Sequence, residues 1–193
     1  MQPISYARHR FPPDVIRHAV WLYVRFTLSY RDVEDLLAER GLEVTNETIR
    51  RRVLKFEPAV ARNLRHRRPT PHGKWHLDEM VVSIASRRMY MWRAVDSEDE
   101  VLEVMVQPRP DKAAALKLLR RLLKRQGFAP KVIVTDKLRS YRAALQLVGF
   151  SGRHEQGLRD NNRAENSHQP VRRRECKMQG FKSRIKAPVL RNV

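Results

Sequence analysis

The sequence predicts an α/β protein: a mixed layer fold preceded by a small helical module. Residues 1–64 contain three short amphipathic helical periods and no run typical of a strand. From residue 75 on, the predicted order is three strands, a helix, a strand, a helix, a short strand or loop, and a last helix, as in sheets covered by helices. Two prolines and a glycine in residues 65–74 predict a linker, so residues 75–193 form the second domain.

Two helices open the chain. Residues 13–26 place apolar side chains on one face, and Pro13 suits a first helical turn. Ser29 and Asp32 have the spacing of a capping box at the start of the second helix, which Gly41 ends as a C-cap glycine.

The third helix is predicted from Thr45 to about Phe56. Its apolar residues point inward and leave a polar, basic outer face. Three short helices of this kind describe a helix-turn-helix DNA-binding module, and a generic three-helix bundle has the same pattern. We expect DNA contacts from Arg50, Arg51 and Lys55.

The second domain begins with strand-like runs at 75–84, 88–95 and 101–107, which predict an antiparallel meander. A helix over 111–126 follows. The apolar run KVIVTD, residues 131–136, predicts a strand covered on both faces.

The remaining part predicts a helix over 139–148 and a short strand or loop over 149–157. Glu165 then lies in a polar stretch that reads as the start of a helix. Pro170 should kink or break that helix, because proline lacks an amide hydrogen and clashes with the preceding turn.

Three acidic residues suggest the chemistry. Asp78 lies in a predicted strand, Asp136 ends another, and Glu165 opens a predicted helix. A crossover between parallel strands can bring Asp136 beside the strand that carries Asp78, and Asp136, at the end of its own strand, can reach a site at the rim of the sheet. Carboxylates gathered in this way bind hard divalent cations, although any of the three could equally be a solvent-exposed or ion-paired residue.

Composition indicates the partner. The formal charge is +19, and residues 67–193 hold 28 basic and 13 acidic residues. Such a charge favours a nucleic acid partner, and acids held within a basic protein suggest metal-assisted chemistry on a polyanion. The single cysteine, Cys176, excludes an internal disulfide framework, and no apolar run reaches the length of a membrane span.

Several motifs occur in a recognisable order: WHLDEMVV, MYMWRAVDSEDEVLEV, VIVTDKLRSY, NNRAENSHQPVRRRE and MQGFKS, with FPPDVI and LSYRDVEDLLAERGLEV before them. As a set they resemble the DDE transposases of bacterial insertion sequences, in the insertion-sequence-six family. The resemblance covers about residues 10–183.

The resemblance implies a ribonuclease H-like catalytic domain in which Asp78, Asp136 and Glu165 are the catalytic residues and bind Mg²⁺, with Mn²⁺ as a substitute. It implies cleavage and joining of double-stranded DNA at element terminal repeats and in target DNA, by a homodimer located in the bacterial cytoplasm at the nucleoid. Further DNA contacts are expected in and after the acidic motifs, from Lys137, Arg172, Arg173, Arg174 and Lys177.

The sequence departs from the family after GFKS. The stretch RIKAPVLRNV, residues 184–193, does not resemble the helix with which the family continues, as in a truncated copy. This leaves a second hypothesis open: a catalytically defective transposase that acts only as a DNA-binding protein. A third, a ribosome-associated basic protein, explains the charge but not the acids.

Overall fold

A computed structural model describes residues 4–26, 28–66, 70–136, 138–157, 161–178 and 180–181. Two expectations lie outside the described residues: the DNA contact of Lys137 and the atypical tail, residues 184–193. Within the described part, no helix is both long and apolar enough to cross a membrane.

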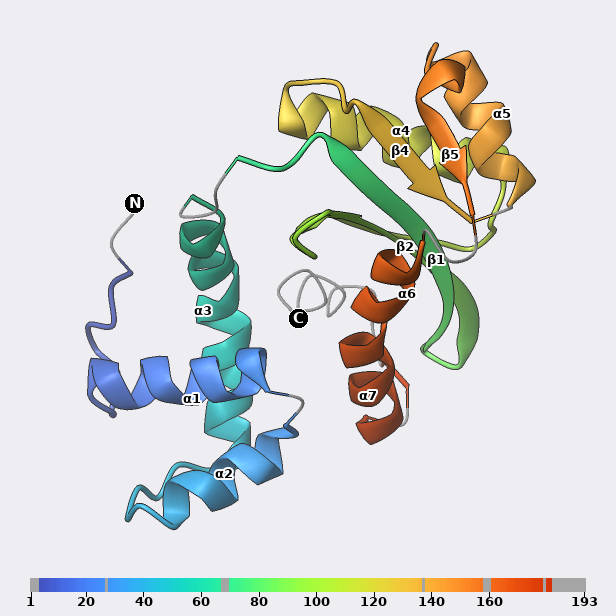
Figure 1. Cartoon of the computed structure of the whole chain (residues 1–193). Helices are drawn as coiled ribbons and strands as arrows, with labels where there is room; N and C mark the ends of the chain where they lie inside the picture. Colours follow the sequence, from blue (N-terminus) through green and yellow to red (C-terminus); the bar gives the residue numbers. More distant parts are fainter. Residues whose placement is uncertain are drawn as a thin grey trace.

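The N-terminal module contains three helices: α1 (Pro13–Arg25), α2 (Tyr30–Ala38) and α3 (Asn46–His66) (Figure 1). The predicted capping box is confirmed, since Ser29 and Asp32 exchange side-chain and backbone hydrogen bonds at the start of α2. Gly41, just after that helix, has the positive φ of 72° that favours glycine. The module has its own apolar core, in which Val33, Leu37 and Ile49 are fully buried.

Helix α3 is longer than predicted. It continues past Phe56 and Pro58 to His66, and so enters the segment expected to be a linker. The apolar spacing also continues, because Val60 packs against the same core as Phe56. This packing extends the helix beyond the end predicted at about Phe56. The domain limits 1–64, 65–74 and 75–193 stay a prediction.

The second domain is built on a five-stranded mixed sheet with strand order β3-β2-β1-β4-β5. The strands are β1 (Lys74–Ile84), β2 (Arg87–Asp96), β3 (Val101–Gln107), β4 (Val132–Thr135) and β5 (His154–Gln156). β1, β2 and β3 form the predicted antiparallel meander, while β4 pairs parallel to β1 and to β5. This is the ribonuclease H-like arrangement.

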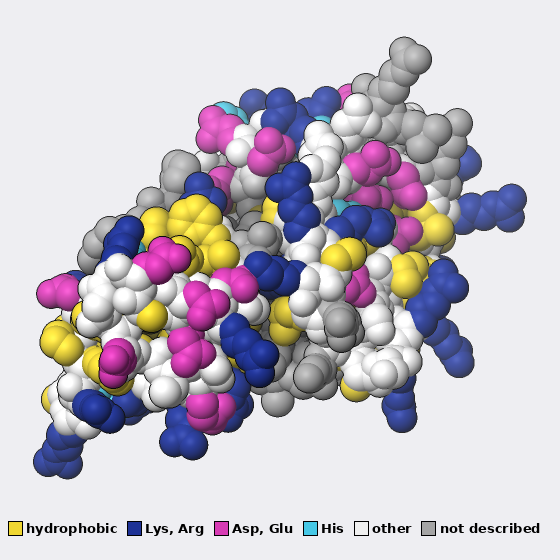
Figure 2. Space-filling model, turned by 90° about the horizontal axis from the view of Figure 1, so that it is seen from below, with side chains coloured by type: hydrophobic (Ala, Val, Ile, Leu, Met, Phe, Trp, Pro, Cys, Tyr) yellow, Lys and Arg dark blue, Asp and Glu magenta, His cyan; other side chains and the backbone are white. Residues whose placement is uncertain are grey.

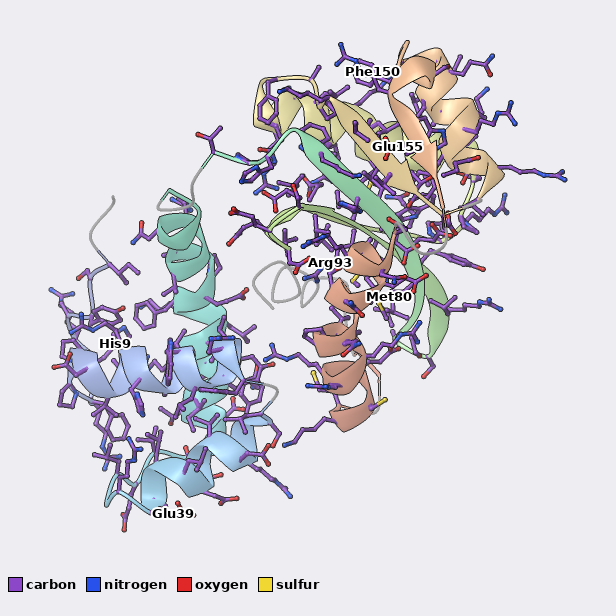
Figure 3. The ribbon with its side chains drawn as sticks, viewed as in Figure 1. His9, Glu39, Met80, Arg93, Phe150 and Glu155 are labelled. Carbon is purple, nitrogen blue, oxygen red and sulfur yellow. The ribbon has the colours of Figure 1, made fainter. Side chains whose placement is uncertain are left out.

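Helices cover both faces of the sheet (Figure 1). On one face, α4 (Lys112–Gln126) and α5 (Arg139–Leu147) pack on the largest core, in which Trp75 and Trp92 are buried. On the other lie α6 (Asn162–Ser167) and α7 (Gln169–Lys177), and Val171 of α7 packs there against Met80 and Val82. The labelled Met80 and Arg93 mark this second face in Figure 3.

The break expected at Pro170 is confirmed. α6 ends at Ser167, and α7 begins at Gln169 with the proline in its first turn, where a missing amide hydrogen has no cost to the helix. His168 lies at the junction and is buried. The break therefore turns one polar stretch into two short helices, of which the first carries Glu165.

Candidate metal centre

Asp78 and Asp136 lie where the parallel pairing between β1 and β4 ends. The last paired residues are Leu77 and Thr135, and each aspartate comes directly after one of them. Because the two strands run in the same direction, both aspartates lie at the same rim of the sheet, as the strand order predicts. Asp78 is buried, with 7% of its surface exposed, and Asp136 is half-buried.

A third acid joins this pair. Asp78, Glu79 and Asp136 can each place one carboxylate oxygen within 4.8 Å of the others. Neighbouring residues in a strand normally point to opposite faces of the sheet. Here β1 extends beyond the end of β4, and Glu79 reaches the same rim on the side that β4 leaves open.

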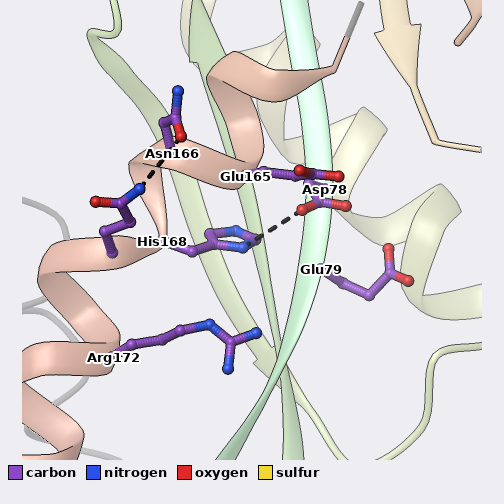
Figure 4. Close-up of a pocket in the computed structure, with 7 residues that line it drawn as sticks. Asp78, Glu79, Glu165, Asn166, His168 and Arg172 are labelled. Atoms are coloured by element: carbon purple, nitrogen blue, oxygen red, sulfur yellow. Dashed lines mark hydrogen bonds and ion pairs between the residues drawn. The ribbon is translucent and has the colours of Figure 1, made fainter. Parts of the chain in front are cut away.

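Glu165 approaches the rim from α6. It lines one pocket together with Asp78, Glu79 and His168, and Figure 4 shows its carboxylate beside that of Asp78. Its charge also raises the pKa of Asp78. Glu165 itself is exposed, so the group of acids is open to solvent on this side.

Two hydrogen bonds restrain the groups around the acids. The side-chain amide of Asn161, just before α6, donates to the carbonyl oxygen of Leu77 at 3.0 Å, and Asn161 is fully buried. The Asp136 carboxylate accepts a hydrogen bond from the backbone N–H of Leu138 at 2.9 Å, which limits its rotation. The acids are thus held by their backbone surroundings.

Crowding of the acids disfavours their ionised forms. Burial, followed by the charges of Glu79, Asp136 and Glu165, raises the pKa of Asp78 to about 8. Burial and the charge of Asp136 raise the pKa of Glu79 to about 7, against the effect of the neighbouring Tyr141 hydroxyl. A divalent cation would relieve this repulsion, so the carboxylates suit such an ion in both donor type and charge.

Two nitrogen side chains line the same pocket. His168 Nδ1 lies 3.4 Å from the Asp78 Oδ2 atom (Figure 4). Burial and the charges of Arg93 and Arg172 lower the pKa of His168 to about 3, so its ring is neutral at physiological pH. Arg172 is exposed and contributes a cation to the pocket lining.

The sequence does not identify Glu79 and His168 as site residues. Glu79 follows Asp78 directly, and alternation along a strand places it on the opposite face of the sheet. The one available signal for His168 is its spacing from Glu165, since residues three apart in a helix share a face. The catalytic and metal-binding roles of Asp78, Asp136 and Glu165 stay a prediction that this geometry supports.

The basic residues predicted on α3 lie on its outer side. Glu47, on the same helix, forms ion pairs with Arg50 at 2.7 Å and with Arg51 at 3.0 Å. Lys55 Nζ lies 3.2 Å from His9 Nε2. All these contacts are exposed, so the side chains stay accessible to a phosphate, and their DNA contact remains a prediction.

The basic residues predicted on α7 have different surroundings. Arg172 and Arg173 are exposed, as expected for DNA contacts. Lys177 forms an ion pair with Asp32 of α2. Arg174 requires a correction: only 2% of it is exposed, and it donates hydrogen bonds to backbone carbonyls of the N-terminal module, so it does not face DNA.

Charge is mixed on the face of the molecule that Figure 2 shows. Figure 2 shows Lys and Arg side chains projecting around the molecule, with Asp and Glu side chains interspersed among them on the same face. On this face the basic residues are therefore spread out rather than gathered in one patch.

Comparison with known proteins gives the family context. The sequence model of a family described as "DDE domain" matches residues 72–190. The transposase for insertion sequence-like element IS431mec of Staphylococcus aureus is 33% identical over 146 residues, or 75% of this chain and 65% of that protein. The transposase for insertion sequence element IS257 in transposon Tn4003, also from Staphylococcus aureus, is 32% identical over the same shares. The chain thus spans 65% of the length of these relatives.

Solved structures show a more distant likeness. The HTLV-2 integrase catalytic core domain in complex with magnesium has 11% identity and a TM-score of 0.46, over 65% of this chain and 85% of that one. A chain of the simian T-cell lymphotropic virus intasome in complex with PP2A regulatory subunit B56 gamma has 17% identity and a TM-score of 0.43, over 53% of this chain and 39% of that one.

Proposed function

The chain belongs to the DDE transposases of bacterial insertion sequences, in the insertion-sequence-six family, and from that premise we propose that it catalyses metal-dependent cleavage and strand transfer of DNA at element ends. One observation carries the proposal: Asp78 and Asp136, far apart in the sequence, can place carboxylate oxygens within 4.8 Å of each other, and Glu165 lines the pocket that contains Asp78. Acids so gathered in a basic protein are useful for chemistry on a polyanion.

The carboxylates are suited to hold the metal ion. Asp78, Asp136 and Glu165 would be its ligands. Glu79 is close enough to take part, and its buried Oε2 atom has no hydrogen-bond partner among the described residues. Oxygen ligands favour Mg²⁺, with Mn²⁺ as a substitute. When bound, such an ion supplies activation of a water or a DNA 3′-hydroxyl and stabilises charge on the phosphate oxygens.

The other residues of the site orient and bind. His168 contacts Asp78 and limits the positions that its carboxylate can take. Arg172 is exposed in the same pocket and can bind a backbone phosphate of the substrate. The helical module, residues 1–64, would hold the double-stranded terminal repeat through Arg50, Arg51 and Lys55, while the sheet domain performs the chemistry on element and target DNA.

Transposition requires that the two element ends be held together, so we propose that a homodimer forms on DNA, with one end bound to each protomer. The site of action would be the bacterial cytoplasm, at the nucleoid. Both statements follow from the proposed reaction on double-stranded DNA.

The test is a cleavage and strand-transfer assay on labelled DNA that carries the element ends. The wild-type chain should act with Mg²⁺ or Mn²⁺ and not with a chelator. Asp78→Asn, Asp136→Asn and Glu165→Gln should each lose activity by at least about a hundredfold and keep DNA binding. Glu155→Gln is the matched control, because this exposed carboxylate on β5 pairs with Lys74 at the surface, away from the acids. DNA binding by wild type without cleavage would instead support the defective, DNA-binding protein.

A further inference from the structure

Arg174 of α7 makes its contacts with the N-terminal module. Its Nη2 atom donates hydrogen bonds to the carbonyl oxygens of Tyr23 and Phe26, both at 2.6 Å. These oxygens lie at the C-terminal end of α1, where the last carbonyls of a helix have no partners within the helix and carry partial negative charge. A buried guanidinium at this place satisfies both oxygens.

An aromatic ring also lies beside the Arg174 guanidinium. The guanidinium carbon lies 4.9 Å from the centre of the Tyr23 ring, which in turn stacks on Tyr30 at 4.4 Å. A cation over an aromatic face is favoured, more so where water is excluded. Three residues further along α7, Lys177 forms an ion pair with Asp32. That carboxylate also belongs to the capping box of α2, so α7 contacts the corner between α1 and α2.

The other side of α7 contacts the catalytic domain. Val171 is buried against the sheet, and the Glu175 carboxylate accepts a hydrogen bond from the backbone N–H of Ser83 at 2.5 Å. Arg172 lines the pocket of acids, and α6 with Glu165 precedes α7 directly. One short helix therefore contacts the sheet, the acidic site and the DNA-binding module.

We propose that Arg174 and Lys177 are positioning residues that fasten the helix-turn-helix module to the catalytic domain. They thereby set where a DNA end held by the module meets the acidic cluster. The expected effect on catalysis rests on the proposed function. The contact that holds the two domains together does not depend on it. Arg174 and Lys177, which the sequence patterns place on DNA, instead contact the N-terminal module.

Arginine is needed at position 174 for a geometric reason. Its planar group presents several donors in a fixed arrangement and stacks on an aromatic ring, whereas a lysine is a point charge on a flexible stem. Arg174→Lys should therefore preserve the contact between α7 and the N-terminal module only in part. Arg174→Met, which keeps the bulk of the side chain, should abolish this contact.

The direct test measures the distance between the two domains. Cys176 is the one cysteine of the chain, so a Cys176→Ser background allows spin labels at Glu39→Cys in the module and Arg120→Cys in α4, both exposed positions. Figure 3 labels Glu39 at the outer end of the module. Pulsed electron paramagnetic resonance should give one narrow distance distribution, which Arg174→Met broadens and Arg174→Lys broadens less.

A second variant guards against misfolding. Lys177 is partly exposed, so Lys177→Glu should keep the fold, checked by circular dichroism, and still broaden the distribution. Unchanged distributions in both Arg174→Met and Lys177→Glu would overturn the proposal, whether or not the protein cleaves DNA.

Activity provides the second readout. Arg174→Met and Lys177→Glu should each bind element-end DNA within about twofold of wild type. They should cleave it at least about tenfold more slowly, since a small misplacement of reacting groups costs a large factor in rate. Broadened distances with an unchanged cleavage rate would overturn the positioning role. Loss of cleavage in the wild type itself would count against the proposed function, and the distances alone would then decide the fastening.

Discussion

The buried side-chain amide of Asn161 donates a hydrogen bond to the carbonyl oxygen of Leu77, the residue directly before Asp78. This bond joins the start of α6, which carries Glu165, to the point where β1 leaves its pairing with β4. The acids thus come together through backbone positions held by a buried amide.

The first prediction concerns this bond. Asn161→Ala should lower the free energy of unfolding by about 1–3 kcal/mol, because it leaves the buried Leu77 carbonyl without this donor. It should also lower the cleavage rate, since Glu165 is less well held. Chemical denaturation measures the first effect. Asn162→Ala, at the next and exposed position, should change neither quantity, and equal effects in the two variants would contradict the role of the bond.

The second prediction concerns pH in the absence of metal. Burial and its acidic neighbours raise the pKa of Asp78 to about 8, so the folded protein keeps a proton that the unfolded chain loses near pH 4. The free energy of unfolding should therefore fall as pH rises from about 4 to about 8. Asp78→Asn should remove part of this fall and be more stable than wild type at pH 8, by on the order of a few kcal/mol.

Thermal unfolding in metal-free buffer at several pH values measures this effect. The two proteins should converge below about pH 4, where wild-type Asp78 becomes protonated in both states. A variant less stable than wild type at pH 8 would show that Asp78 contributes to folding rather than opposing it.

The third prediction concerns Glu79, the acid that sequence alternation places on the other face. If it takes part in metal binding, Glu79→Gln should weaken Mn²⁺ affinity by about tenfold to a hundredfold, the size of effect known for residues that support metal ligands. Calorimetric titration of Mn²⁺ measures it. Glu155→Gln serves again as the surface control, and an affinity of Glu79→Gln equal to that of the control would remove Glu79 from the centre.

The fourth prediction concerns the module. Replacing Arg50, Arg51 or Lys55 by alanine should weaken binding to all DNA sequences alike. It should also reduce the salt dependence by about one unit for each phosphate that the protein no longer neutralises. Fluorescence anisotropy across a salt series measures both quantities. Binding unchanged in all three variants would place the DNA-binding surface on other residues.

Local patterns predict much of the fold because the interactions that produce it are local. The capping box of Ser29 and Asp32 and the break at Pro170 depend on residues a few positions apart, and both are confirmed. The order of strands and helices also predicts that Asp136 ends a strand beside the one that carries Asp78, and β1 and β4 are paired in that way.

Features that depend on long-range packing do not follow from such patterns. Helix α3 passes Pro58 because Val60 continues the apolar packing against the module's core. Glu79 reaches the site because β1 extends beyond β4. In the sequence, Arg174 is one of three equivalent basic residues, and only the position of α1 shows that it is buried.

The most direct test of the central claim is to locate a metal ion. Crystals of the chain with Mn²⁺ and element-end DNA would show the ion by its anomalous scattering. We predict a peak bound by the carboxylates of Asp78 and Asp136, with Glu165 beside it and a DNA phosphate in contact. A peak at other residues, or a DNA end bound far from these acids, would contradict the proposed metal centre.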